Sequence, residues 1–361
     1  MKSASQGVDK ICNSMLSLLS SFVAPTLCHI FNFSVSNSVY PSVWKKSIVR
    51  PLPKVSTPTS LNDFRPISLL PTLSKIFERL IHSQITTYLM DHKLLDTYQS
   101  GFRRDVSTTT ALLSITNDIY KAKEENNLVL LLLLDFSKAF DSVNFDLLLA
   151  KLKLFNFSPS VIAWFSNYLK GRYQQVKNRT FSSSLKVTSG VPQGSVLGPL
   201  LFLLFINDLS NSLNCSYHLF ADDLQIYFSF KANAYCECLN NVNFNLSKIL
   251  EWCRINFIGL NCAKSQAIVL GRDFALNRFL ATNKMDVVLD GVKLSFLTSV
   301  RNLGLYFDNT LSWNNHVQTI CKKVNLNLMP LLKFKNMSSQ KTKLIVFKSI
   351  FLPFFDYCDV L

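Results

Sequence analysis

The residues best suited to chemistry are two adjacent acids, Asp222 and Asp223, within the stretch His218–Tyr227. They separate two apolar runs, Tyr217–Ala221 and Leu224–Phe230, whose Tyr, Phe, Ile and Leu content predicts two strands. Adjacent residues in a regular strand point to opposite faces, so two carboxylates converge only where that alternation breaks, as at a hairpin turn. Asp is also a common turn residue, so the pair by itself fits a solvated turn as well as a metal site.

A third acid, Asp135, directly follows the five leucines of Leu130–Leu134, a run that predicts a strand buried on both faces. If the strands are neighbours, the three acids converge at one edge of a sheet. Converging carboxylates repel one another and favour bound cations, and oxygen ligands without His or Cys favour a hard ion such as magnesium. Two such ions can stabilise the attacking and leaving oxygens of an in-line phosphoryl displacement. Taken alone, Asp135 also fits an acid that caps the turn after its strand.

The elements around these acids predict an α+β fold. The order is a strand ending at Asp135, two helices, the acid hairpin, a helix and a strand, which is typical of an antiparallel sheet with helices on one face. We expect a helical lead-in over about 1–40, a basic strand over 44–54 and a helix over 72–91. Further expected elements are helices over about 107–123, 143–154, 158–169 and 235–257, an apolar helix ending near 207, a hairpin of 173–176 with 185–188, a strand over 266–270, short strands over 286–308 and helices beyond 313.

Composition limits the class of protein. The chain has 361 residues, 48% of them hydrophobic, which is enough for a large core and predicts two or three subdomains. The 38 Lys and Arg against 23 Asp and Glu give a formal net charge of +15, which suits nucleic acid first and a membrane surface second, although a solubilising surface is the alternative. Nine scattered cysteines, an odd number, favour a reduced intracellular chain. No signal peptide or transmembrane segment is evident in the sequence.

Seven short motifs, in one order, resemble the reverse transcriptase of non-LTR (LINE-type) retrotransposons of the jockey-like kind. They cover roughly residues 40–308, and seven in order are far more specific than any one alone. The motifs are Pro51-Leu52-Pro53-Lys54, Phe64-Arg65-Pro66-Ile67-Ser68-Leu69-Leu70, Gln99-Ser100-Gly101-Phe102-Arg103, Leu134-Asp135-Phe136-Ser137-Lys138-Ala139-Phe140-Asp141, Ser189 through Pro199, Phe220-Ala221-Asp222-Asp223, and Leu260-Asn261-Cys262-Ala263-Lys264.

The resemblance implies a right-hand polymerase fold. We expect a helical lead-in at 1–39, fingers at 40–126, a palm at 127–308 built on the antiparallel sheet, and a partial helical thumb at 309–361 that is cut short. The reverse transcriptase domain as a whole would cover about 40–308. The implied activity is magnesium-dependent transfer of nucleotides from dNTPs to a primer 3′-OH on an RNA template.

The resemblance also implies the catalytic groups. Asp135, Asp222 and Asp223 would be the catalytic acids and would hold two Mg²⁺ ions, for which Mn²⁺ could substitute, and the backbone carbonyl of Phe136 would add a further ligand. Lys264 would donate a proton to the departing pyrophosphate.

Five residues would bind the incoming nucleotide by the same resemblance. Lys54 and Arg65 would hold the triphosphate, where Arg offers a two-pronged donor and Lys a point charge. Phe140 would be the steric gate that excludes a ribose 2′-hydroxyl, although an isolated aromatic residue is more often part of a core. Gln193 and Gly194 would line the nucleotide pocket, where the alternative is a simple turn at a helix start.

The implied partners are an RNA template, a DNA primer, their RNA–DNA hybrid and dNTPs, with Arg103 and Arg172 on the template backbone. We expect no membrane association, an intracellular location and action in the nucleus; the sequence leaves the oligomeric state open.

No endonuclease region precedes residue 40 and no zinc knuckle or RNase H region follows, which predicts a fragment, a decayed copy or an isolated polymerase core. The alternative function is therefore that of an inactive or domesticated remnant that only binds nucleic acid. A nucleotide cyclase would leave the Arg65–Ser68 motif and the loop around Gln193 unexplained.

Overall fold

The computed structural model describes residues 6–178, 180–282, 286–332 and 339–361. The chain divides into two compact units whose segments alternate along the sequence. Unit 1 comprises Met1–Asp96, Ser137–Ser210 and Cys253–Gly259, and unit 2 comprises Thr97–Phe136, Asn211–Trp252 and Leu260–Leu361. These boundaries differ from the contiguous fingers, palm and thumb expected from the sequence, which stay a prediction. Four elements cross a boundary: β4 (Phe136–Ser137), η3 (Asn207–Ser212), α9 (Tyr235–Asn256) and β9 (Gly259–Leu260).

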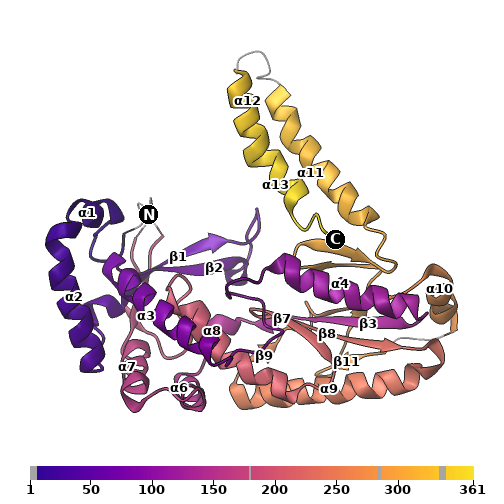
Figure 1. Ribbon diagram of the computed structural model, residues 1–361, viewed down its shortest axis with the longest axis horizontal. Helices are drawn as coiled ribbons and strands as arrows, with labels where there is room; N and C mark the ends of the chain where they lie inside the picture. The colour runs from indigo at the N-terminus through magenta and orange to yellow at the C-terminus, as the bar shows by residue number, and fades with distance from the viewer. Residues whose placement is uncertain (1–5, 179, 283–285, 333–338) are drawn as a thin grey trace. The chain divides into compact units, whose positions relative to one another are not determined.

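Unit 1 holds a four-stranded sheet in the order β2-β1-β5-β6, formed by β1 (Lys46–Pro53), β2 (Phe64–Leu69), β5 (Tyr173–Val176) and β6 (Leu185–Lys186). Strand β1 pairs antiparallel with β2, beside which it lies in Figure 1, and parallel with β5. The helices and helical turns of this unit are α1 (Asn13–Leu18), α2 (Ser20–Ser36), η1 (Ser42–Lys45), η2 (Leu61–Asp63), α3 (Thr72–Asp91), α5 (Ala139–Ser142), α6 (Phe145–Leu154), α7 (Pro159–Leu169) and α8 (Leu197–Ile206).

Helix α8 is the centre of unit 1. It is apolar on every side, and all of its residues except Pro199 are buried, as expected for a helix surrounded by other elements. Helices α3 and α6 pack against it. An aromatic cluster forms a second part of the core, with ring centroids 4.6 Å apart for Phe31 and Phe77 and 5.0 Å apart for Tyr40 and Tyr168.

Unit 2 is built on a five-stranded sheet in the order β13-β10-β3-β8-β7. Its strands are β3 (Leu128–Leu134), β7 (Ser216–Phe220), β8 (Asp223–Phe230), β10 (Gln266–Leu270) and β13 (Ser295–Phe296). All neighbours are antiparallel except the edge pair of β10 and β13. The remaining elements are α4 (Thr108–Glu124), η4 (Ala232–Ala234), α10 (Asp273–Thr282), β11 (Val288–Leu289), β12 (Val292–Lys293), β14 (Ser299–Asn302), β15 (Leu305–Asp308), α11 (Asn314–Leu332), α12 (Gln340–Val346), η5 (Phe347–Phe351) and α13 (Leu352–Asp356).

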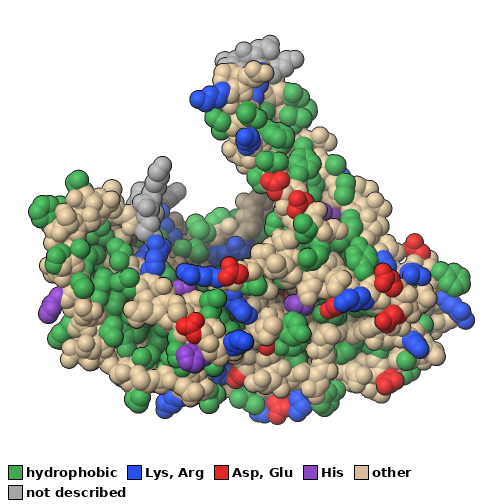
Figure 2. Space-filling view, viewed as in Figure 1, with side chains coloured by type: hydrophobic (Ala, Val, Ile, Leu, Met, Phe, Trp, Pro, Cys, Tyr) green, Lys and Arg blue, Asp and Glu red, His purple; other side chains and the backbone are tan. Residues whose placement is uncertain are grey.

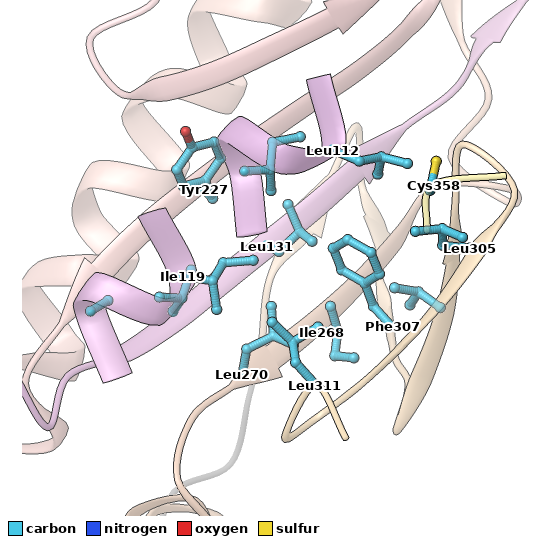
Figure 3. Close-up of a cluster of buried hydrophobic side chains, with 14 residues drawn as sticks. Leu112, Ile119, Leu131, Tyr227, Ile268, Leu270, Leu305, Phe307, Leu311 and Cys358 are labelled. Carbon is cyan, nitrogen blue, oxygen red and sulfur yellow. The ribbon is translucent and has the colours of Figure 1, made fainter. Parts of the chain in front are cut away.

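Both faces of the unit 2 sheet are buried. On one face α4 packs against alternate residues of β3 and β10, together with the β14–β15 hairpin, to form the cluster in Figure 3. The other alternating set on β3, from Leu128 to Leu134, is buried as well, as predicted from the leucine run. In Figure 1, α9 runs along the side of the sheet away from α4. The predicted α+β fold with an antiparallel sheet is thus confirmed, but helices lie along both faces rather than one.

The C-terminal helices leave apolar side chains in solvent. Helix α11 buries none of its residues, and Val317, Leu326 and Met329 are more than half exposed. Figure 2 shows hydrophobic side chains along this segment. Within the described ranges, none of the helices is long and apolar enough to cross a membrane.

Candidate active site

The adjacent acids lie at a hairpin turn, as predicted. Strands β7 and β8 pair down to Phe220 opposite Asp223, so the turn between them contains two residues, Ala221 and Asp222. Ala221 has a φ of 57°, a left-handed conformation that a residue with a Cβ rarely adopts. Asp222 is half-buried, and Asp223 is the first residue of β8.

The third acid reaches the same end of the sheet. Strand β3 pairs with β8 down to Leu134 opposite Leu224, and Asp135 follows directly, beside the start of β8. The turn between β9 and β10 holds the backbone of Asp135: the Asp135 N–H donates to Ser265 Oγ at 3.3 Å, and its carbonyl accepts the N–H of Asn261 at 2.7 Å. The register of two strand pairs therefore places all three predicted acids at one end of the sheet.

Burial and the nearby acids raise the pKa of Asp223. Its carboxyl has a pKa of about 6, chiefly because surrounding protein desolvates it, and further because Asp222 and Asp135 repel its negative charge. The residue as a whole still reaches solvent. A cation near Asp222 or Asp135 would offset this repulsion and stabilise the ionised form of Asp223.

The carboxylates do not close around a common point. Across residues 6–178, 180–282, 286–332 and 339–361, no three His, Cys, Asp or Glu side chains come close enough to form a ready metal centre. The donor set nevertheless suits a hard divalent cation, since it offers oxygen only and its repulsion would be relieved by positive charge.

Phe136 directly follows Asp135 in the sequence, and Lys264 lies in the turn that binds the Asp135 backbone. Lys264 is exposed, and its backbone N–H donates to the carbonyl of Asn261 at 3.1 Å. The N–H of the same Asn261 binds the Asp135 carbonyl. Phe136 is buried, with its ring edge-on to Trp252 at 6.4 Å between centroids. Unit 2 therefore contains every residue expected to bind metal or to serve as an acid in the reaction.

Unit 1 contains the residues expected to bind the triphosphate. Arg65 on β2 lies opposite Leu52 on β1, and Lys54 follows β1 by one residue, so both cations lie at the same end of this strand pair. Both are exposed. The Lys54 Nζ donates to the carbonyl of Asn62 at 2.9 Å, within the loop between the strands.

The loop before α8 holds Gln193 and Gly194 close to two other motifs. The Gln193 side chain donates to Asp141 Oδ1 at 2.9 Å, and its carbonyl accepts the N–H of Ser68 at 2.7 Å. Burial raises the pKa of Asp141, an effect that the hydrogen bond from Gln193 opposes. Gly194 has a φ of 124°, and a Cβ there would lie 2.5 Å from the carbonyl oxygen of Ser68, so only glycine fits.

Phe140 is half-buried and rests on the apolar centre of unit 1. Its ring stacks on Phe202 of α8 with 4.3 Å between centroids and 24° between planes. Its carbonyl accepts the N–H of Val191 at 2.8 Å, which ties α5 to the loop that carries Gln193. The residue expected to act as a steric gate is thus held both through its ring and through its backbone carbonyl.

The two arginines expected on the template lie in different settings. Arg172 is 3% exposed, donates to the carbonyl of Tyr168 at 2.9 Å and lies over the rings of Tyr168 and Tyr40. A guanidinium buried in this way cannot reach a template, so this expectation is wrong and Arg172 supports the core instead. Arg103 is half-buried and donates to the carbonyl of Gln99 at 3.0 Å.

Sequence reasoning gave no role to Glu78, which organises the start of α8. This carboxylate is fully buried and accepts the N–H groups of Val196 and Leu197 at 2.7 and 3.2 Å, as well as the hydroxyl of Ser74 at 2.9 Å. It thereby satisfies N–H groups that a helix start leaves unpaired. The signal in the sequence is an acid next to Phe77 on the apolar face of the predicted helix at 72–91.

Residues 45–329 match the family described as reverse transcriptase (RNA-dependent DNA polymerase). The chain therefore belongs to the reverse transcriptase family, and the family resemblance and the polymerase fold expected from the sequence are confirmed. Its relatives include three proteins of Drosophila melanogaster. They are the probable RNA-directed DNA polymerase from transposon BS (28% identical over 94% of this chain and 38% of that one), that from transposon X-element (29%, 98% and 39%), and the RNA-directed DNA polymerase from mobile element jockey (27%, 96% and 38%).

The chain spans well under half the length of these relatives. Among solved structures, apo telomerase from Candida tropicalis truncated from its C-terminal domain is similar with a TM-score of 0.49 and 13% identity, over 76% of this chain and 55% of that one. That likeness is too weak to bear on the site.

Proposed function

We propose that the chain is an RNA-directed DNA polymerase that transfers nucleotides from dNTPs to a primer 3′-OH on an RNA template. The observation that carries the proposal is the strand register that brings Asp135 beside the Asp222–Asp223 hairpin turn. In the reaction the primer hydroxyl loses its proton and attacks the α-phosphorus of the dNTP, and pyrophosphate leaves.

The family generally uses divalent metal ions, and we propose magnesium, with manganese as a substitute. Asp135 and Asp222 would hold two ions together with Asp223 and the carbonyl of Phe136. The ions would supply charge stabilisation at the attacking and leaving oxygens. The protein's own part is to keep three carboxylates at one sheet end, where burial and the two neighbouring acids already raise the pKa of Asp223.

The proposed nucleotide site uses the cations and the loop of unit 1. Lys54 and Arg65 would bind the triphosphate, and Lys264 would protonate the leaving pyrophosphate. Gln193 and Gly194 would line the base and sugar pocket, and Phe140 would exclude ribonucleotides by occupying the space of a 2′-hydroxyl. The stacking of Phe140 on Phe202 supports that role, since a gate must resist displacement.

The proposed partners are an RNA template, a DNA primer and their hybrid, with Arg103 as a contact to the template backbone and with action in the nucleus. The net charge of +15 supports a polyanionic partner. We also propose fingers at 40–126, a palm at 127–308 and a partial thumb at 309–361.

Primer extension on an RNA template tests the proposed activity. The wild type should extend a DNA primer with dNTPs and Mg²⁺ and stop when EDTA removes the metal. Asp135→Asn should lower the rate about 1,000-fold or more, because the carboxylate acts where charge develops in the transition state. Asp290→Asn, a substitution at an exposed acid between β11 and β12, is the control and should leave the rate unchanged. Equal rates for the wild type and Asp135→Asn would falsify the proposal.

A further inference from the structure

The turn that carries the acids has a conformation that its own sequence does not favour. Ala221 occupies the first position of a two-residue turn with a φ of 57°, where its Cβ crowds the backbone. Glycine or asparagine is usual at such a position. A strained turn of this kind persists only when the surrounding structure holds it.

A single side chain binds both backbone polar groups of Ala221. Gln99 Oε1 accepts the Ala221 N–H at 2.9 Å, and Gln99 Nε2 donates to the Ala221 carbonyl at 3.3 Å. The same Oε1 also accepts the N–H of Gly101 at 2.7 Å. Gln99 is 3% exposed, so water does not compete for these bonds.

The segment that carries Gln99 is itself fixed to the hairpin. The Leu219 N–H donates to the Tyr98 carbonyl at 3.0 Å, and the Ser100 N–H donates to the Leu219 carbonyl at 2.8 Å, which makes a parallel bridge of Gln99 and Leu219. The Arg103 side chain also donates to the Gln99 carbonyl at 3.0 Å, within the same segment. Residues 98–100 therefore continue the sheet beyond β7.

Gly101 lets this segment approach the turn. A Cβ at position 101 would lie 2.2 Å from the Ala221 nitrogen and 2.8 Å from its Cα. Both atoms belong to backbone that cannot rotate away, so any larger residue would push the turn and the segment apart. Glycine is required here by contact with the acid-bearing turn.

We propose that Gln99 is a positioning residue that, with Gly101, holds the Ala221–Asp222 turn so that the carboxylates of Asp222 and Asp223 face the proposed metal site. The inference rests on the proposed function, because positioning has a purpose only if these acids bind metal. Glutamine suits the task because its amide offers one acceptor and one donor at a fixed spacing.

Amide hydrogen exchange, read by mass spectrometry, tests whether Gln99 holds the turn without any metal present. Gln99→Met keeps the length of the side chain but removes its hydrogen bonds to Ala221 and to Gly101, and should raise exchange in the peptide 216–226 about tenfold. The matched control is Asn245→Leu, since Asn245 is 1% exposed and braces the Asn214 backbone at the opposite end of β7. The control should leave exchange at residues 220–223 as in the wild type.

Binding of Mn²⁺ to the free protein, followed by the loss of its electron paramagnetic resonance signal, tests whether the turn positions the acids. Gln99→Met and Gly101→Ala should each weaken binding at least about fivefold, and Asn245→Leu should change it less than twofold. Gln99→Glu, which keeps the acceptor but loses the donor, should lie between the wild type and Gln99→Met, and it replaces Gln99→Met if that variant does not fold.

Two results would overturn the inference: unchanged exchange at the turn in Gln99→Met, or raised exchange with Mn²⁺ affinity within twofold of the wild type. Failure of the proposed function looks different. If the wild type binds no Mn²⁺, the proposed metal site is wrong, whereas the exchange measurement still decides whether Gln99 holds the turn.

Discussion

The carboxyl of Asp223 destabilises the folded protein when it is ionised. Its pKa is about 6 in the fold, against about 3.9 for an unperturbed Asp, so the folded state binds this proton more tightly than the unfolded state does. Above pH 6 the charge therefore lowers the free energy of unfolding, and this loss of stability disappears as the pH falls through 6 toward 4. Asp223→Asn should accordingly stabilise the metal-free protein at pH 8, by on the order of 1 kcal/mol, because solvent still reaches the side chain and reduces the cost of its charge.

Urea denaturation at pH 8 and at pH 4.5 measures this difference. The stabilisation by Asp223→Asn should be largest at pH 8 and clearly smaller at pH 4.5, which is still slightly above the pKa of an unfolded Asp. Asp359→Asn, at an exposed acid, should show no such dependence. Equal stability of Asp223→Asn and the wild type at pH 8 would contradict a raised pKa of Asp223.

The ring of Phe140 gives a prediction about the choice of sugar. Phe140→Val should raise the incorporation of ribonucleotides relative to deoxynucleotides about tenfold or more, because the smaller side chain leaves room for a 2′-hydroxyl. Primer extension with each nucleotide type gives the ratio. Phe274→Val, at an exposed ring of α10, is the control and should leave the ratio unchanged. Unchanged discrimination in Phe140→Val would rule out the gate.

The three acids could be predicted from the sequence, whereas the residues that hold them in position could not. Asp135 and the Asp222–Asp223 pair stand next to apolar runs, so strand periodicity alone places them at strand ends. Gln99 binds Ala221 across 122 residues of sequence, and nothing local to Gln99 indicates that partner. Arg172 was misjudged for a related reason: its side chain lies over the ring of Tyr168, four residues earlier, and over the ring of Tyr40, which comes from a distant segment.

At the scale of elements, Glu78 ties α3 to the start of α8. Glu78→Ala should lower the free energy of unfolding by about 3 kcal/mol, because it leaves two helix N–H groups and a hydroxyl buried without their acceptor. Glu78→Gln should lower it by about 1–2 kcal/mol, since one neutral acceptor oxygen remains. Chemical denaturation gives both values. Glu124→Gln, on the exposed end of α4, is the matched control, and a loss as small as the control's would show that the buried carboxylate does not stabilise α8.

The elements themselves were predicted best where the periodic pattern is long. Helix α3 has the expected bounds, and β10 coincides with its predicted range. Helix α10 was not predicted, because its ten residues bury only Leu276 and Phe279 and provide too little periodicity. Helices were predicted along one face of the sheet but lie along both. The run of leucines in β3 indicates that both faces are covered, but it does not indicate which elements cover them.

At the scale of the whole molecule, the excess of basic residues predicts how binding responds to salt. Affinity for an RNA–DNA hybrid should fall roughly 100-fold between 50 and 200 mM salt if about four phosphates are contacted. Fluorescence anisotropy with a labelled hybrid measures the slope. An affinity independent of salt would contradict binding through phosphates.

The organisation of the whole molecule was the hardest level to predict. The sequence predicts contiguous subdomains, but the compact units draw on segments that alternate along the chain. Hydrophobic periodicity describes which face of an element is buried and carries no information about which distant element covers it. The pairing register of β3 with β8 determines which acids come together, because it places Asp135 beside a hairpin almost ninety residues later in the sequence.

The most direct test of the central claim is the rate of primer extension on an RNA template, with Mg²⁺ and dNTPs, for the wild type and for the double variant Asp222→Ala/Asp223→Ala. The double variant should keep its fold and its affinity for the hybrid but lose extension by about 1,000-fold or more, because it lacks two of the three proposed metal-binding carboxylates. Extension by both proteins at the same rate would show that the hairpin acids are an ordinary turn and that the proposed site is wrong.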